Sequence, residues 1–92
     1  MKIKVNFGGQ LRNIIGNDSV HFEVASTAKL MMLFNTIVQS ASNEVRNLLL
    51  DEQGNCQPTI LAFINNEQIL TGENPILHEG SVVTLLTPMS GG

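Results

Sequence analysis

The sequence predicts an α+β domain: a mixed sheet of four to five strands that packs on one main helix, with a short second helix after it. Residues 2–7 and 19–24 alternate polar and apolar side chains, which is typical of strands with one buried face. Residues 28–41 instead place apolar side chains at helical spacing. Further extended segments follow at residues 59–64 and 81–87. Because a sheet with an apolar face needs a cover, the long helix in the middle of the chain can supply it.

The first two predicted strands, residues 2–7 and 19–24, are expected to form an antiparallel hairpin. Gly8 and Gly9 interrupt the alternation of the first strand, and residues 16–18 (Gly-Asn-Asp) are typical of a turn. We therefore expect a long connecting loop over residues 8–18.

The main helix is expected to follow Ser26 or Thr27, since either side chain could cap its first turn. Two apolar stripes compete for its buried face, and spacing alone does not decide between them. One stripe is Leu30, Leu33, Phe34, Ile37, Val38 and Ala41, and the other is Ala28, Met31, Phe34, Val38 and Ala41. Met31 or Met32 is expected to be partly exposed.

The second helix is expected to begin at Ser42 and to end before residues 51–55, where Gly54 suits a left-handed stop. Beyond it, residues 59–64 are apolar on both faces, which indicates a central strand. Asn65 and Asn66 tolerate positive φ and predict a tight hairpin turn into a short strand at residues 67–70.

The last predicted strand, residues 81–87, is also apolar on both faces. We expect it to be central, with residues 2–7 as its parallel neighbour. Pro88 lacks an N–H and tends to end strand pairing. The expected organisation is therefore one domain over residues 1–87, followed by a tail at residues 88–92.

Composition excludes several classes of function. The 92 residues suit one domain, and their net charge of −3 comes without any Lys/Arg cluster, so a nucleic-acid partner is not expected. No run approaches the ~18 apolar residues of a membrane span, and residues 1–6 do not resemble a signal peptide. Cys56 is the single cysteine, so an internal disulfide is impossible. We expect a cytoplasmic protein.

The chain ends in Ser90-Gly91-Gly92, which places a free carboxylate on a slim stalk. Extended, residues 88–92 would reach about 17 Å at 3.3–3.6 Å per residue. Such a tail can enter a channel too narrow for side chains. A carboxylate is a poor acyl donor, so Gly92 would need activation, most simply by adenylation.

Residues 77–92 resemble the C-terminal signature of the ubiquitin-like sulfur carriers. This family includes the small subunit of molybdopterin synthase (MoaD), the thiamine-pathway carrier (ThiS) and the small archaeal modifier proteins. Its pattern is an acidic-Gly turn, an apolar strand, one or two prolines, small residues and Gly-Gly. Residues 7–12, 49–54 and 63–67 are similar to interior segments of the family. Thr87 departs from it, where many relatives carry a second proline, and Ser81 stands where an acidic residue is common.

The resemblance implies a β-grasp (ubiquitin-like) domain that is a protein co-substrate rather than an enzyme, with no bound cofactor. An E1-like adenylating enzyme, of the types that serve molybdopterin or thiamine synthesis, would use ATP to adenylate Gly92. Sulfur would then replace one oxygen, and Gly91 would keep the tip flexible. The thiocarboxylate would donate sulfur to an acceptor enzyme, and the large subunit of molybdopterin synthase is the leading candidate for this acceptor. Alternatives are a carrier for thiamine synthesis or tRNA thiolation, a modifier that forms isopeptide bonds to lysine, and a non-catalytic interaction module.

A partner-binding surface is expected on the sheet face that points away from the helix. If Ile60, Ala62, Val83 and Leu85 face the helix, the opposite face carries Leu61, Phe63, Thr84 and Leu86. Pro88, Met89 and Ser90 at the base of the tail would extend it. Contiguous apolar patches usually mark partner sites. Ordinary strand hydrophobicity or a homodimer contact are the alternatives.

Other reactive residues carry weaker hypotheses. Cys56 could relay a persulfide, although an incidental thiol is the favoured interpretation. His21 and His78 match no zinc spacing, so no metal site is expected. Asp51 and Glu52 are best interpreted as a solvated helix end.

Overall fold

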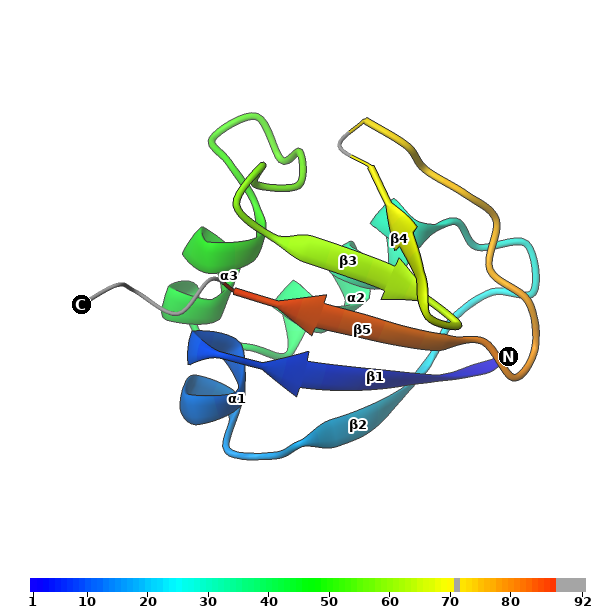
Figure 1. Cartoon of the computed structure of the whole chain (residues 1–92), viewed down its shortest axis with the longest axis horizontal. Helices are drawn as coiled ribbons and strands as arrows, with labels where there is room; N and C mark the ends of the chain where they lie inside the picture. Colours follow the sequence, from blue (N-terminus) through cyan, green and yellow to red (C-terminus); the bar gives the residue numbers. More distant parts are fainter. Residues whose placement is uncertain (71, 88–92) are drawn as a thin grey trace.

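A computed structural model describes residues 1–70 and 72–87 of the chain. Over these ranges the chain forms a five-stranded sheet with the order β2-β1-β5-β3-β4, and three helices. The elements are β1 (Lys2–Gly8), α1 (Gln10–Ile15), β2 (Ser19–Glu23), α2 (Leu30–Gln39), α3 (Asn43–Leu49), β3 (Leu61–Ile64), β4 (Glu67–Ile69) and β5 (Val82–Leu86). Figure 1 looks onto one face of the sheet, with α2 behind it. The α+β class with a mixed sheet is confirmed.

The middle of the sheet is a parallel pair. β1 and β5 run side by side with Val5 opposite Val83. β2 pairs antiparallel with β1, and β3 pairs antiparallel with β5. Both central strands carry fully buried residues, which fits their position between other strands. The expected central placement of the last strand, with the first strand as its parallel neighbour, is confirmed.

The turn between β3 and β4 depends on two asparagines. Asn65 and Asn66 have φ of 51° and 72°, the left-handed pair that a type I′ hairpin requires. Asn65 also joins the turn to β5, because its Oδ1 accepts a hydrogen bond from the Val82 N–H at 2.9 Å. The predicted hairpin is therefore confirmed.

The core lies between the sheet and α2. The helix buries Leu30, Leu33, Phe34 and Ile37, so the stripe that begins at Leu30 faces the sheet. Met32 lies on the solvent side with 53% of its surface exposed.

One expectation about the first connection is wrong: residues 8–18 are not a long loop, since they contain α1. Gly9 begins this helix at φ 66°, and Gly16 ends it at φ 85° with its N–H bonded to the Arg12 carbonyl. A six-residue helix is too short to leave a clear period in the sequence. Its stability comes from tertiary packing, because Leu11 is completely buried.

The start of α2 is also different from expectation. The N-cap position is Lys29, and neither Ser26 nor Thr27 caps the helix. A distant segment does so instead: the Leu30 N–H donates to the Pro75 carbonyl, and the Met31 N–H donates to Asn74 Oδ1, both at 2.9 Å. Long-range contacts of this kind leave no local sequence signal.

The second predicted helix, α3, begins as expected. Ser42 is its N-cap, with Oγ accepting a hydrogen bond from the Val45 N–H. The helix ends at Leu49, before residues 51–55 as expected, but Gly54 is not its stop, since Leu50 is already extended. Gly54 does adopt a positive φ, but it closes a later turn in which its N–H donates to the Asp51 carbonyl. Leu50 is buried and forms an isolated antiparallel bridge with Cys56.

Within the described ranges, no helix combines the length and the apolar character that crossing a membrane requires.

Candidate partner-binding face and tail exit

The sheet separates the residues of β3 and β5 onto two faces. Ala62 pairs with Leu85, and both are buried on the side of α2. Leu61 lies opposite Leu86 in the ladder, one residue out of phase with that pair. Since successive side chains of a strand point to opposite faces, Leu61 and Leu86 lie on the side away from the helix.

The same alternation places Phe63 and Thr84 on this outer face, because they also pair with each other. Leu61 is 42% exposed, whereas Phe63, Thr84 and Leu86 are half-buried. The four residues that the sequence placed together therefore do share one solvent-facing surface, which we call the outer face. Whether a partner binds there stays a prediction.

Val82 belongs to the outer face as well, and the sequence analysis missed it. It is half-buried and lies two residues before Thr84 in β5. The period of two that predicted Thr84 and Leu86 also includes Val82, so the signal was present. Val82 pairs with Lys4 of β1, where the apolar surface meets a charged one.

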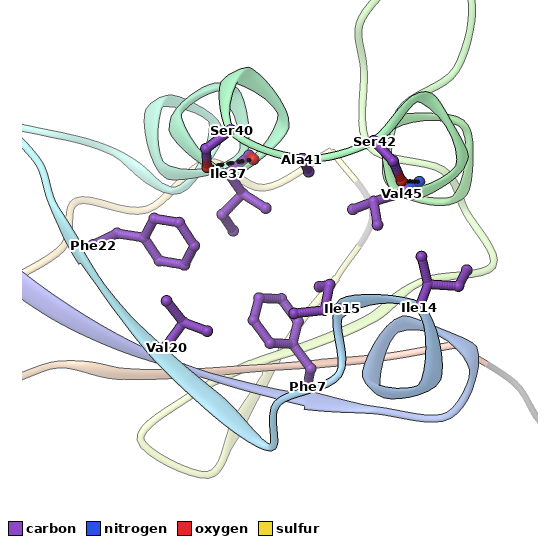
Figure 2. Close-up of a pocket in the computed structure, with 10 residues that line it drawn as sticks. All are labelled: Phe7, Ile14, Ile15, Val20, Phe22, Ile37, Ser40, Ala41, Ser42 and Val45. Carbon is purple, nitrogen blue, oxygen red and sulfur yellow. Dashed lines mark hydrogen bonds between the residues drawn. The ribbon is translucent and has the colours of Figure 1, made fainter.

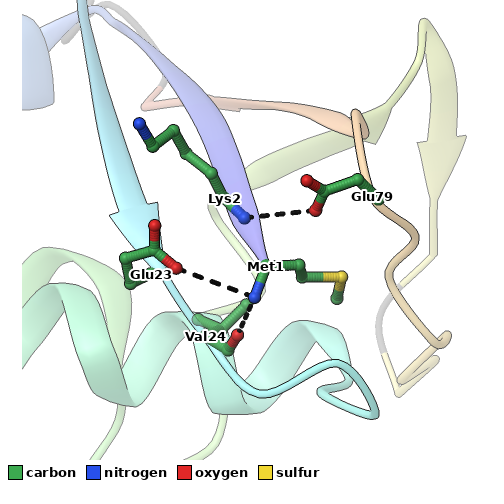
Figure 3. A network of polar contacts seen from close by, with 5 residues as sticks. All are labelled: Met1, Lys2, Glu23, Val24 and Glu79. Atoms are coloured by element: carbon green, nitrogen blue, oxygen red, sulfur yellow. Dashed lines mark hydrogen bonds and ion pairs between the residues drawn. The ribbon is translucent and has the colours of Figure 1, made fainter.

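On the same side of the sheet, the surface that β1 and β2 contribute beside the outer face is polar and exposed. Lys4 lies opposite His21, and Lys2 lies opposite Glu23. Figure 3 shows how the beginning of β1 is held: the Met1 amino group donates to the Val24 carbonyl and lies 3.7 Å from Glu23 Oε2. The Lys2 N–H donates to Glu79 Oε2 at 3.3 Å. These contacts tie β1 to β2 and to the segment before β5.

The chain leaves the sheet at the opposite end of β1. Gly8 pairs with Leu86 at the ends of the two parallel strands, so residue 87 lies beside the β1–α1 turn. The Gln10 N–H donates to Thr87 Oγ1 at 2.6 Å. The predicted tail residues Pro88, Met89, Ser90, Gly91 and Gly92 lie outside the described residues, so their roles stay predictions.

Several solved structures share this architecture. SAMP1 from Haloferax volcanii matches with a TM-score of 0.86 at 20% identity, over 100% of both chains. A putative molybdopterin converting factor, subunit 1, from Pyrococcus furiosus has a TM-score of 0.74 at 20% identity and covers 97% of this chain and 99% of its own. The chain has the β-grasp fold.

A chain of the BexX/CysO complex from Amycolatopsis orientalis also matches this β-grasp domain, with a TM-score of 0.71 at 20% identity, over 98% of this chain and 99% of the other. No known protein-family profile matches the sequence, and no curated protein matches it. The likeness in structure thus establishes the ubiquitin-like fold that the sequence predicted.

A cavity of about 300 Å³ opens between the helices and the β1–β2 edge of the β-grasp domain. Figure 2 shows its apolar lining, which includes Phe7, Val20 and Phe22. Its two hydroxyl groups serve the backbone: Ser40 Oγ donates to the Ile37 carbonyl, and Ser42 Oγ accepts from the Val45 N–H. No titratable side chain lines the cavity, so its lining offers no acid or base for catalysis.

Cys56 is poorly suited to the persulfide relay considered above. Partial burial raises the pKa of its thiol, and the negative charge of Asp51 raises that pKa further. The thiolate, which is the nucleophile, is therefore disfavoured near neutral pH. In the part of the chain that the structure describes, no three His, Cys, Asp or Glu side chains gather as a metal site would need.

Proposed function

We propose that this β-grasp protein is a sulfur carrier whose Gly92 is adenylated and then converted to a thiocarboxylate. The observation that carries the proposal is the position of the diglycine end: it follows a central strand, β5, by only a few residues. We therefore expect the domain to present a slim acyl group to a partner that binds the outer face. The chain acts as a co-substrate, and its partners supply the catalysis.

The chemistry proceeds in two displacement steps. A carboxylate oxygen of Gly92 attacks the α-phosphorus of ATP and pyrophosphate leaves. Sulfide supplied by the sulfur donor then attacks the acyl carbon and AMP leaves, so that one oxygen of the carboxylate has been replaced by sulfur. Gly91 and Gly92 lack side chains that would obstruct the narrow site in which both steps must occur.

The outer face is the proposed docking surface for the activating enzyme and, in turn, for the sulfur acceptor. It combines Leu61, Phe63 and Leu86 with the partly polar Thr84, the mixture expected of a surface that must also be stable when free. Pro88, Met89 and Ser90 would continue it toward the active site of the partner. The BexX/CysO complex supports the expectation that a β-grasp domain of this kind binds a partner protein.

Molybdopterin synthesis is the proposed destination of the sulfur, with the large subunit of molybdopterin synthase as acceptor. The likeness to the Pyrococcus molybdopterin converting factor supports this choice. We expect the reactions to take place in the cytoplasm, where the carrier meets ATP and an E1-like adenylating enzyme.

Protein modification is the second candidate. The match to SAMP1 extends over 100% of both chains, and related structures carry the name small archaeal modifier protein 1. In this alternative, a lysine amine attacks the activated Gly92 and an isopeptide bond replaces the thiocarboxylate.

Intact-mass measurement tests the proposal. The full chain is incubated with the E1-like adenylating enzyme of the same organism, ATP and a sulfur donor. We expect a product in which one oxygen is replaced by sulfur, and none from a chain that lacks Gly92. An unchanged mass with ATP and sulfur donor present would contradict the proposal, whereas lysine-linked products would favour the modifier.

A further inference from the structure

The side chain of Thr87 occupies an unusual position at the point where the tail begins. It is only 6% exposed, although it follows the last residue of β5. Its Oγ1 accepts a 2.6 Å hydrogen bond from the Gln10 N–H and lies 3.5 Å from the Gly8 carbonyl oxygen, to which it donates. One hydroxyl group thus joins the end of β5 to the turn between β1 and α1.

Thr87 also supplies what α1 lacks. The N-cap residue of this helix is Gly9, which has no side chain to accept a hydrogen bond from the first turn. The first N–H groups of a helix need an acceptor from elsewhere. The Thr87 hydroxyl provides one from 77 positions away in the sequence.

The backbone packs closely around this contact. A Cβ atom on Gly9 would lie 2.5 Å from both the carbonyl oxygen and Oγ1 of Thr87. One on Gly8 would meet only a methyl carbon at the end of the flexible Leu86 side chain, which can move aside. Gly9 therefore allows the β1–α1 turn to wrap the end of β5 at a distance that a side chain at this position would prevent.

The β1–α1 turn is fixed by contacts with the rest of the domain. Leu11 of α1 is completely buried, and Arg12 forms an ion pair with Asp18 across the connection to β2. The Phe7 N–H donates to the Asp18 carbonyl at 2.8 Å. The Gln10 N–H and the Gly8 carbonyl, which bond to Thr87, therefore belong to a well-packed part of the domain.

We propose that Thr87 is a positioning residue: its hydroxyl group, held by Gln10 and Gly8, fixes the direction in which residue 88 leaves the domain. This inference rests on the proposed function of Gly92. Docking through the outer face places the carrier on its partner, and the direction of the exit then decides how often the carboxylate reaches the reacting phosphorus. Small errors of placement reduce reaction rates strongly even when binding is unaffected.

The test measures the steady-state rate of adenylation by the E1-like enzyme with ATP, and pyrophosphate release monitors the reaction. Thr87→Val keeps the shape and the branched Cβ but removes the hydroxyl group. We expect kcat to fall about tenfold, the scale of a modest misplacement, while KM for the carrier stays within about twofold of the original. Thr87→Ser retains the hydroxyl group and is expected to restore most of kcat.

Thr36→Val is the matched control, because it makes the same chemical change at another hydroxyl-to-backbone bond, from Thr36 Oγ1 to the Met32 carbonyl on α2. It should leave kcat and KM unchanged. Hydrogen exchange gives a readout that does not need the enzyme: the Gln10 amide should exchange faster in Thr87→Val, and at the original rate in Thr87→Ser.

The outcomes separate this inference from the proposed function. If Thr87→Val keeps the original kcat, or if KM rises while kcat is unchanged, Thr87 does not position the tail. If the unaltered chain releases no pyrophosphate and gains no sulfur, the proposed function itself fails. The hydrogen-exchange result then still shows whether the Thr87 hydroxyl holds α1.

Discussion

At the scale of single residues, Gly9 and Gly16 illustrate two different needs for glycine. Both have a left-handed φ, at 66° and 85°. A Cβ on Gly16 would meet nothing within 4 Å, whereas one on Gly9 would collide with the backbone carbonyl oxygen of Thr87. Backbone conformation alone requires a glycine at position 16. At position 9, conformation and close packing both require it.

We therefore predict that Gly9→Ala lowers the free energy of unfolding more than Gly16→Ala. The left-handed conformation of Gly16, at φ 85° and ψ 5°, costs a side chain about 1 kcal/mol. Gly9, at φ 66° and ψ −141°, lies outside the left-handed helical region, where the cost is at least as large. At Gly9 the collision with backbone atoms adds about 1–3 kcal/mol more. Urea denaturation of both variants measures the difference, and equal losses would show that the β1–α1 turn is looser than the structure indicates.

At the scale of elements, the three described helices obtain their N-terminal acceptors from three different places. α3 uses the adjacent Ser42. α2 uses Asn74 and Pro75, and α1 uses Thr87. Only the first arrangement is local, which explains why only the start of α3 was predicted correctly.

Substitution of two serines tests this difference. Ser42→Ala removes the acceptor of the Val45 N–H and should lower the free energy of unfolding by about 1 kcal/mol. Ser26→Ala, at the position that the sequence suggested as a cap, should change it by less than about 0.5 kcal/mol. Thermal and urea unfolding give both values. A larger loss from Ser26→Ala would contradict the observed start of α2 at Leu30.

At the scale of the whole molecule, the helix α2 covers one face of the sheet and leaves the other open to solvent. The open face is divided: β3 and β5 contribute apolar side chains, and β1 contributes Lys2 and Lys4. Thr87, the last described residue, follows β5 within the apolar half. We therefore expect a partner that binds this half to be able to engage the residues that follow Thr87.

We predict that Phe63→Asp raises KM for the carrier in adenylation at least tenfold, since a charge would be buried against the partner. Met32→Asp is the control, because it changes an exposed apolar residue of α2 to the same acid on the covered side of the sheet. It should leave KM unchanged. Normal circular dichroism with an original KM for Phe63→Asp would remove the outer face as the docking surface.

The sequence by itself determined the α+β class, the central position of the last strand, the turn at Asn65 and Asn66, and the outward face of Leu61 and Phe63. These features follow from local periodicity and from backbone preferences, which act between near neighbours in the chain. The resemblance in residues 77–92 predicted the β-grasp fold that the structural matches share.

Only the tertiary structure decided which face of the main helix is buried, that residues 10–15 form a helix, and where α2 starts and ends. It also brought Thr87 against Gln10, across 77 positions of sequence. Each of these features depends on a contact between distant segments, and the energy of such a contact is absent until the chain has folded. Local sequence patterns therefore cannot record it.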